Sequence, residues 1–399
     1  MHSLSACGKY VLAGAGALAA LASLGTAHAG FTVLHAFTGA KNDGAYPEAR
    51  LTEDSAGSFY GTTWGGGAHR LGTVFKLAPD GTETVLYAFA GGNDGAEPGA
   101  GLVEDKTGNF YGTTVNGGTD DDGTVFKLAS DGTETVLHIF TGGGNDGFTP
   151  FDALIRDKAG NLYGTTANGG PRGFGTAFKL APDGAETVLC GFAAKDGAYP
   201  VAGLIQDKAG NLYGTTLRGG TDGNGILFKI APNGTETILH AFRGGKHGDG
   251  GRPYGGLIHD KAGNLYSTTA GGSGIGCHDG YGCGTVFKLV PDGTELILYA
   301  FRGHKHDDGA RPEAGLIQDE AGNLFGTTAR GGTYGSGTVF KLTPHGKEKT
   351  LHAFSGGSDG AYPYANLIED KAGNLYGTTS AGGSRRCEGG CGTVFRIKE

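Results

Sequence analysis

The 399-residue chain contains 82 glycines and 13 prolines and carries a formal net charge of −8. The negative charge and the lack of any basic tract exclude a nucleic-acid ligand, because phosphate binding needs clustered positive side chains. The glycines recur at fixed offsets between Val, Ile, Leu, Phe and Tyr, which indicates turns between strands and excludes a disordered low-complexity chain.

Residues 1–29 are predicted to form a secretory signal peptide. Lys9 precedes an apolar stretch from Tyr10 to Leu24, and Ala27-His28-Ala29 has the small-x-small pattern of a cleavage site. The alternative is a membrane anchor, but the stretch is short and rich in Gly and Ala. We therefore expect an exported protein, periplasmic or extracellular, whose mature chain 30–399 forms one domain without a membrane span.

The mature chain is a tandem repeat. The tetrapeptide Tyr-Gly-Thr-Thr, or a variant with one change, occurs seven times with a period of about 53 residues, which is typical of propeller blades. Each period predicts four short strands, named A to D. Examples are Leu204–Asp207 for A, Asn211–Thr216 for B, Gly72–Leu77 for C and Glu236–Phe242 for D.

The connections between these strands predict two different faces. Asp-Lys-Ala-Gly-Asn and Pro-Asp-Gly-Thr give tight A–B and C–D turns, because Asp accepts backbone N–H bonds and Gly adopts a positive φ. The B–C and D–A loops are longer and rich in glycine. In an antiparallel blade both long loops fall on one face, which is therefore the face expected to bind a ligand.

The order of strands at the two ends predicts a closed ring. The mature chain begins with a D strand, Phe31–Phe37, and ends with a C strand, Gly392–Ile397. The last blade therefore lacks a D strand that the N-terminal strand can supply, which leaves no open edge. An open solenoid would show capping repeats instead. The sequence predicts an all-β, seven-bladed β-propeller of four-stranded antiparallel blades, closed by its N-terminal strand.

The combined motifs Gly-Asn-Leu-Tyr-Gly-Thr-Thr, Gly-Thr-Val-Phe-Lys-Leu and Leu-His-Ala-Phe, followed by Asp-Gly-Ala-x-Pro, resemble the Gloeobacter/Verrucomicrobia-type tandem repeat of exported bacterial proteins. The resemblance covers Gly30 to Glu399. It implies a propeller-like exported protein, implies no enzymatic activity and supplies no catalytic residues. Members of that family often carry a C-terminal surface anchor, which this chain does not show, so the resemblance does not extend to surface attachment.

Two B–C loops, in blades five and seven, are longer than the others and contain cysteine pairs. In an oxidising compartment we expect the disulfides Cys277–Cys283 and Cys387–Cys391. Zinc binding by the thiolates is the alternative. Cys190 lies inside a D strand, where we expect a buried, inert thiol.

Each D–A loop contains an Asp-Gly pair with a Pro close behind it. The Asp is expected to cap local N–H groups; a ring of Ca²⁺ ligands is the alternative, although one Asp per blade does not supply six to eight oxygens. The residue before the Pro varies between blades. Three of these residues, Tyr46, Tyr199 and Tyr362, are predicted to stack on sugar or aliphatic faces, with neutral drift as the alternative.

The loops around blade five combine histidines and carboxylates that are expected to converge on one face. The candidates for ligand binding are His247, Asp249, His278, Asp279, His304, His306, Asp307 and Asp308. Among them His304, His306 and Asp308 are candidates for a divalent metal, because imidazole and carboxylate are transition-metal ligands. A solvated polar rim is the alternative.

Two further positions repeat around the ring. The first position lies in the D strand. It is His in four repeats, beginning with His35, and Tyr or Cys in the other three, and it is predicted to pack between blades. The other ends strand A and is predicted to form a mixed ring at the tight-turn mouth of the channel. That second set is Glu53, Glu104, Arg156, Gln206, His259, Gln318 and Glu369.

The near-uniform repeats favour a non-catalytic binding or scaffold module, because an enzyme needs one asymmetric set of acid, base and stabilising groups. The expected partner is a glycan, a small polar ligand or an envelope protein, and no cofactor is expected beyond a possible divalent metal. The alternative is a metal-assisted hydrolase or lyase that uses the blade-five loops or the central channel. A purely structural envelope component is a third class.

Overall fold

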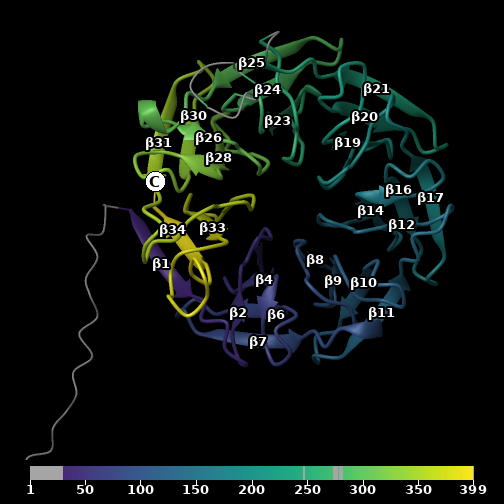
Figure 1. Ribbon diagram of the computed structural model, residues 1–399, viewed down its shortest axis with the longest axis vertical. Helices are drawn as coiled ribbons and strands as arrows, with labels where there is room; N and C mark the ends of the chain where they lie inside the picture. Colours follow the sequence, from purple (N-terminus) through teal and green to yellow (C-terminus); the bar gives the residue numbers. More distant parts are fainter. Residues whose placement is uncertain (1–29, 246–247, 273–276, 278–281, 399) are drawn as a thin grey trace, which may run out of the picture.

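The computed structural model describes residues 30–245, 248–272, 277 and 282–398. Their main strands form seven four-stranded antiparallel sheets, arranged as blades around a central axis (Figure 1). The predicted seven-bladed propeller is therefore confirmed. No helix in these residues is long and apolar enough to cross a membrane.

Each blade runs from a two-residue inner strand to a six-residue outer strand. From the inner to the outer strand, blade one is β3 (Thr52–Glu53), β4 (Phe59–Thr63), β6 (Thr73–Leu77) and β7 (Glu83–Ala88); blade two is β8 (Val103–Glu104), β9 (Phe110–Thr114), β10 (Thr124–Leu128) and β11 (Glu134–Ile139); and blade three is β13 (Ile155–Arg156), β14 (Leu162–Thr166), β16 (Thr176–Leu180) and β17 (Glu186–Gly191). Blade four is β18 (Ile205–Gln206), β19 (Leu212–Thr216), β20 (Ile226–Ile230) and β21 (Glu236–Ala241), and blade five is β22 (Ile258–His259), β23 (Leu265–Thr269), β24 (Thr285–Leu289) and β25 (Glu295–Ala300). Blade six is β27 (Ile317–Gln318), β28 (Leu324–Thr328), β30 (Thr338–Leu342) and β31 (Glu348–Ala353), and blade seven is β32 (Ile368–Glu369), β33 (Leu375–Thr379), β34 (Thr393–Ile397) and β1 (Phe31–Ala36).

The hydrophobic core lies between blades. The strand pattern Thr-Val-Phe-Lys-Leu buries every residue except Lys, because both faces of a blade are covered by its neighbours. The Phe that ends each D strand packs edge-on against a C-strand Phe of the next blade, as Phe140 does on Phe178 at 5.3 Å between ring centroids. Each fully buried side chain of this kind contributes about 1.5–3 kcal/mol.

The ring closes as predicted. β1 pairs with β34 in antiparallel register from Phe31 opposite Ile397 to Ala36 opposite Thr393, and Figure 1 shows the two strands side by side. Phe31 also stacks on His352 of β31 with 3.7 Å between ring centroids, so the closing strand contacts the sixth blade as well.

The two long loops of each blade pair with each other, which confirms that they share one face. Three blades form a two-residue ladder and four form a single bridge between the D–A segment and the B–C loop. The ladders join β2 (Gly44–Ala45) to β5 (Gly65–Gly66), β12 (Gly147–Phe148) to β15 (Asn168–Gly169) and β26 (Gly309–Ala310) to β29 (Arg330–Gly331). Short 3₁₀ turns, η1 (Gly92–Asp94) and η3 (His304–His306), lie in two of the D–A loops.

Candidate functional site

The variable residue before each D–A proline adopts a left-handed backbone conformation. All seven have φ between 54° and 60° although none is glycine. Both backbone polar groups are held: Tyr199 N–H donates to Phe174 O, and Tyr199 O accepts from Leu217 N–H, at 3.0 Å each. These bonds offset a conformation that costs roughly 1–2 kcal/mol per residue. The backbone is therefore fixed by the two flanking B–C loops, while the side chain is free to vary.

The left-handed residue and the following proline turn the chain into the central channel. The segments that follow the seven prolines line one cavity of about 520 Å³. Its first ring of lining residues comes directly after the prolines, one from each blade. In ring order these residues are Glu48, Gly99, Phe151, Val201, Tyr254, Glu313 and Tyr364.

This ring has a polar half and an apolar half. Tyr254, Glu313, Tyr364 and Glu48 come from consecutive blades and present phenols and carboxyls. The other half consists of Gly99, Phe151 and Val201. Trp64 is a neighbour of this half but does not line the cavity: a Cβ on Gly99 would lie 2.9 Å from its ring, and the Phe151 ring centroid is 6.1 Å away. The cavity thus offers hydrogen-bonding groups on one side and an aromatic face on the other.

The two glutamates of the ring differ in their partners. Glu313 lies 3.2 Å from the Arg311 guanidinium, which opposes the rise in pKa that burial causes. No described residue donates a hydrogen bond to Glu48. Burial, together with the charge of Glu313, raises the pKa of Glu48 to about 7. The Glu48 carboxyl is therefore a group to which a ligand can hydrogen-bond.

The cavity is also lined by one carboxyl, Asp152, one guanidinium, Arg50, and one amide, Asn366. Asp152 accepts the N–H groups of Ala153 and Gly203, both at 2.6 Å, and burial raises its pKa despite nearby Arg50. Asn366 accepts the Gly315 N–H through its side-chain oxygen at 2.6 Å. These bonds hold Asp152 and Asn366 in place and shape the wall of the cavity.

The structure describes only some of the blade-five residues singled out in the sequence. His247, His278 and Asp279 lie outside the described residues. Asp249 and Asp308 are both 3% exposed and hydrogen-bond back to their own D–A loops.

The remaining blade-five residues lie on η3. His304 contacts the carbonyl oxygen of Gly332 through Nδ1 at 2.7 Å, while His306 and Asp307 are exposed. Within the described parts of the chain, these residues and Asp308 do not form a metal-competent group. The blade-five ligand and metal sites stay predictions.

Tyr46, Tyr199 and Tyr362 are half-buried on the loop side of their prolines and do not line the cavity. Arg330 lies over the Tyr362 ring at 4.2 Å, which occupies one face of that ring. The predicted ring at the end of strand A is mostly exposed, and Arg156 of that ring lies over Tyr111 of the neighbouring blade at 5.5 Å.

Both predicted disulfides form. Cys277–Cys283 and Cys387–Cys391 have Cα–Cα distances of 5.3 and 5.1 Å. Each packs against a glycine of the adjoining D–A loop, Gly303 and Gly39 respectively, where a Cβ would lie 3.0 Å from a sulfur. Each disulfide therefore closes its own long B–C loop and packs against the D–A loop that leads to the next blade.

Cys190 is half-buried, and its thiol donates to Glu236 at 3.3 Å. Burial and the Glu236 carboxylate raise the pKa of this thiol, which makes it a poor nucleophile. This arrangement agrees with the inert thiol expected from the sequence.

These observations define a seven-bladed propeller with a ligand-sized cavity in its central channel. The chain belongs to the Gloeobacter/Verrucomicrobia repeat family, whose sequence profile matches residues 72–278 and 274–399. No curated protein matches the sequence.

Solved structures share the fold at low identity. The extracellular domain assigned to the hybrid two-component system BT4673 from B. thetaiotaomicron is 13% identical, with a TM-score of 0.58 over 93% of this chain and 40% of that chain. A second structure, of the BT4673 extracellular domain assigned to a one-component system, is 12% identical, with a TM-score of 0.54 over 92% of this chain and 40% of that chain. A protein from Bacteroides uniformis assigned as a 6-phosphogluconolactonase is 16% identical, with a TM-score of 0.50 over 77% of this chain and 84% of that chain. This chain spans less than half the length of the BT4673 domain, and these identities establish the fold alone.

Sequence reasoning missed the residues that line the cavity. The position before each proline varies, and so does the position after it, from Gly99 to Tyr254. The variation at the position after the proline was the sequence signal that could have identified the cavity residues. Which of the two side chains enters the channel depends on the left-handed turn before the proline, which the residue types do not specify.

Proposed function

We propose that this chain is an exported, non-catalytic binding module that holds a glycan or another small polar ligand in its central channel, at the end nearest the long loops. The observation that carries the proposal is the division of the lining ring into a polar and an apolar half. Repeats that keep their framework residues differ at this ring, which is where specificity would reside.

The chemistry of the two halves fits a sugar. Pyranose rings carry C–H groups on one face and hydroxyls around the edge, so they pack on aromatic rings while hydrogen-bonding to carboxyls and phenols. Phe151 would provide the aromatic surface. Glu48 and Tyr364 would accept and donate hydrogen bonds at the opposite wall. The fold shared with the extracellular domain of BT4673, assigned to a two-component system, supports a binding role outside the cytoplasm.

A glycan array followed by calorimetry on the mature chain tests the proposal. Phe151→Ala and Glu48→Gln should each weaken binding of the best-binding glycan by about five- to thirty-fold, since one stacking or charged hydrogen-bond contact is worth about 1–2 kcal/mol. Tyr334→Ala is the matched control, because Tyr334 is 60% exposed on the blade-six B–C loop and should leave affinity unchanged.

A His304→Ala/His306→Ala variant separates the channel from the blade-five loops. If it abolishes binding while Phe151→Ala does not, the ligand lies over blade five and the channel proposal is wrong. An array without a single hit would favour a protein partner from the cell envelope.

One observation favours a second candidate, a hydrolase or lyase in the channel. A carboxyl with a pKa of about 7 beside a second carboxyl, as in Glu48 and Glu313, is what a general acid requires. Release of reducing ends or of unsaturated products from the bound glycan, lost in Glu48→Gln, would establish this candidate in place of the non-catalytic module.

A further inference from the structure

A second set of polar groups lies between the blades, far from the channel, and forms one junction per blade. In each junction a D-strand residue meets the Asp of the following D–A loop and the first D-strand residue of the next blade. The seven junctions are His35/Asp43/Glu83, Tyr87/Asp94/Glu134, His138/Asp146/Glu186, Cys190/Asp196/Glu236, His240/Asp249/Glu295, Tyr299/Asp308/Glu348 and His352/Asp359/Phe31.

Among the described residues, two of these junctions bring three ligand-type atoms within 4.8 Å of one another. In the first, His35 Nε2 lies 3.2 Å from Asp43 Oδ1. In the second, His240 Nε2 lies 3.4 Å from Asp249 Oδ1 and 3.8 Å from Glu295 Oε2. Two ligands of a tetrahedral zinc ion are about 3.3–3.5 Å apart, given bond lengths of 2.0–2.2 Å. The His–Asp pairs thus already have this spacing, and the Glu oxygen would move slightly closer to complete the site.

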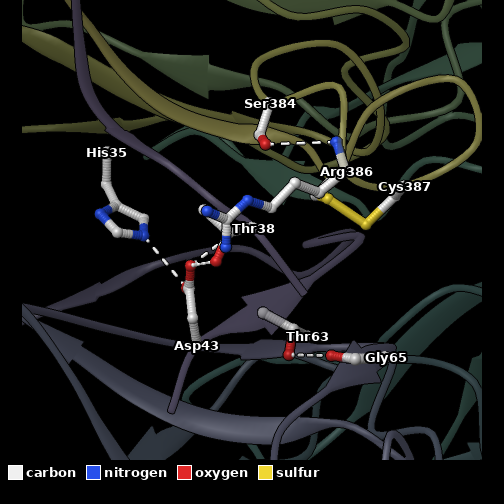
Figure 2. The surroundings of a disulfide bond; sticks show 9 residues. His35, Thr38, Asp43, Thr63, Gly65, Ser384, Arg386 and Cys387 are labelled. Atoms are coloured by element: carbon white, nitrogen blue, oxygen red, sulfur yellow. Dashed lines mark hydrogen bonds and ion pairs between the residues drawn. A yellow bond between two sulfur atoms is a disulfide. The ribbon is translucent and has the colours of Figure 1, made fainter. Parts of the chain in front are cut away.

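Figure 2 shows His35 and Asp43 of the first junction. The His35 ring points toward the Asp43 carboxylate, and the Arg386 side chain, from the loop that carries Cys387, points toward the same carboxylate. Asp43 Oδ2 accepts the Thr38 N–H, which leaves Oδ1 as the oxygen that faces His35. At the second junction Asp249 Oδ2 is likewise occupied by Arg243.

Each of the two junctions also contains a carboxyl oxygen without a partner. Glu83 Oε1 and Glu295 Oε1 are buried and accept no hydrogen bond from the described residues, and the Glu295 side chain is only 10% exposed. The same oxygen is unpaired in Glu134, Glu186 and Glu236 at other described junctions, which do not bring three ligand atoms together. A buried, unpaired carboxylate oxygen costs about 1–3 kcal/mol or more. Two carboxyls whose oxygens lie within 4.8 Å of each other repel unless a proton or a cation lies between them.

We propose that the His35/Asp43/Glu83 and His240/Asp249/Glu295 junctions each bind one divalent cation of the zinc class. His Nε2, Asp Oδ1 and a Glu oxygen would be the protein ligands, with water as the fourth. One imidazole and two carboxylates suit zinc better than calcium, which takes six to eight oxygens. The first ion would join β1 to β7 and so fasten the closing strand to blade one; the second would join β21 to β25.

The tyrosine junctions of the same chain provide matched controls for the two proposed zinc sites. At the Tyr87 and Tyr299 junctions a phenol donates to the Asp carboxylate, so the same fold accepts tyrosine where the proposed sites have histidine. His35→Tyr and His240→Tyr therefore remove a ligand while keeping a side chain that the junction is built to hold. Glu134→Gln changes a tyrosine junction and should not affect zinc.

The test uses the mature chain without a histidine tag, stripped with EDTA and dialysed against Zn²⁺. Metal analysis should find two zinc ions per chain, one after His35→Tyr or His240→Tyr, and none after both. Replacing zinc by Co²⁺ should give the visible absorption of four-coordinate cobalt, halved in each single variant. Glu134→Gln should retain both ions.

The same experiment can overturn the proposal. Absence of bound zinc in the parent chain, or unchanged zinc content in the double variant, contradicts it. Zinc lost only in His304→Ala/His306→Ala would assign the metal to the blade-five loop instead. Circular dichroism of each apo variant confirms that a loss of zinc is not a loss of fold.

Discussion

Asp207 accepts hydrogen bonds from the backbone of Ala209 and Asn211, from the Asn211 amide and from the Tyr213 hydroxyl, at 2.7–3.0 Å. The same carboxylate closes the A–B turn in the other blades, which is why Asp-Lys-Ala-Gly-Asn could be recognised as a turn from its letters alone. The hydrogen bonds hold the pKa of Asp207 below its usual value. A single side chain therefore fixes both strands of the hairpin.

Asp207→Ala should lower the free energy of unfolding by about 2–3 kcal/mol, because four hydrogen bonds lose their acceptor. Asp183→Ala is the matched control in a C–D turn, where the carboxylate accepts from Ala185 N–H alone, and it should cost about 1 kcal/mol or less. Urea unfolding of both variants measures the difference. Equal losses would show that the shared acceptor role is not what stabilises the A–B turn.

At the scale of the strands and loops, the ring closure and the disulfides could be predicted from the sequence. The offset between the first strand at Phe31 and the last at Thr393 required a shared blade, and the cysteines occurred in the two longest B–C loops. The partners of the D-strand His could not be predicted. His35 looked like a packing residue because its contacts with Asp43 and Glu83 exist only after two blades meet.

Removing one disulfide tests the role of the long loops. Cys387→Ser/Cys391→Ser should lower the free energy of unfolding by about 2 kcal/mol, the chain-entropy value for so short a loop. The comparison chain carries Cys190→Ser only and keeps both disulfides. Chemical denaturation with and without a reducing agent gives the values. If the reducing agent lowers the stability of the double variant as much as that of the comparison chain, the Cys387–Cys391 disulfide contributes nothing.

At the scale of the whole molecule, buried carboxyls between blades make the ring sensitive to pH. Burial is the largest cause that raises the pKa of Glu134, Glu186 and Glu348 to about 7 in the folded chain. A raised carboxyl pKa means that the folded state binds more protons than the unfolded state. The free energy of unfolding therefore decreases as the pH rises from the ordinary pKa of glutamate through 7. The turn carboxylates have lowered pKa values and lose their contribution below pH ~4.

We therefore expect the melting temperature of the EDTA-treated chain to be highest near pH ~5 and to fall toward pH ~8. The triple variant Glu134→Gln/Glu186→Gln/Glu348→Gln should show a smaller fall over the same range, because its amides do not titrate. Differential scanning fluorimetry across the range provides the comparison. A melting temperature that rises from pH ~5 to pH ~8 in the parent chain is inconsistent with protonated junctions.

The central claim is that the ligand occupies the channel between Glu48 and Phe151. A crystal structure of the mature chain with its best-binding glycan tests this claim most directly. We expect a sugar ring stacked on Phe151, with its hydroxyls within hydrogen-bond distance of Glu48 or Tyr364. A sugar bound over the blade-five loops, with the channel holding only water, would contradict it.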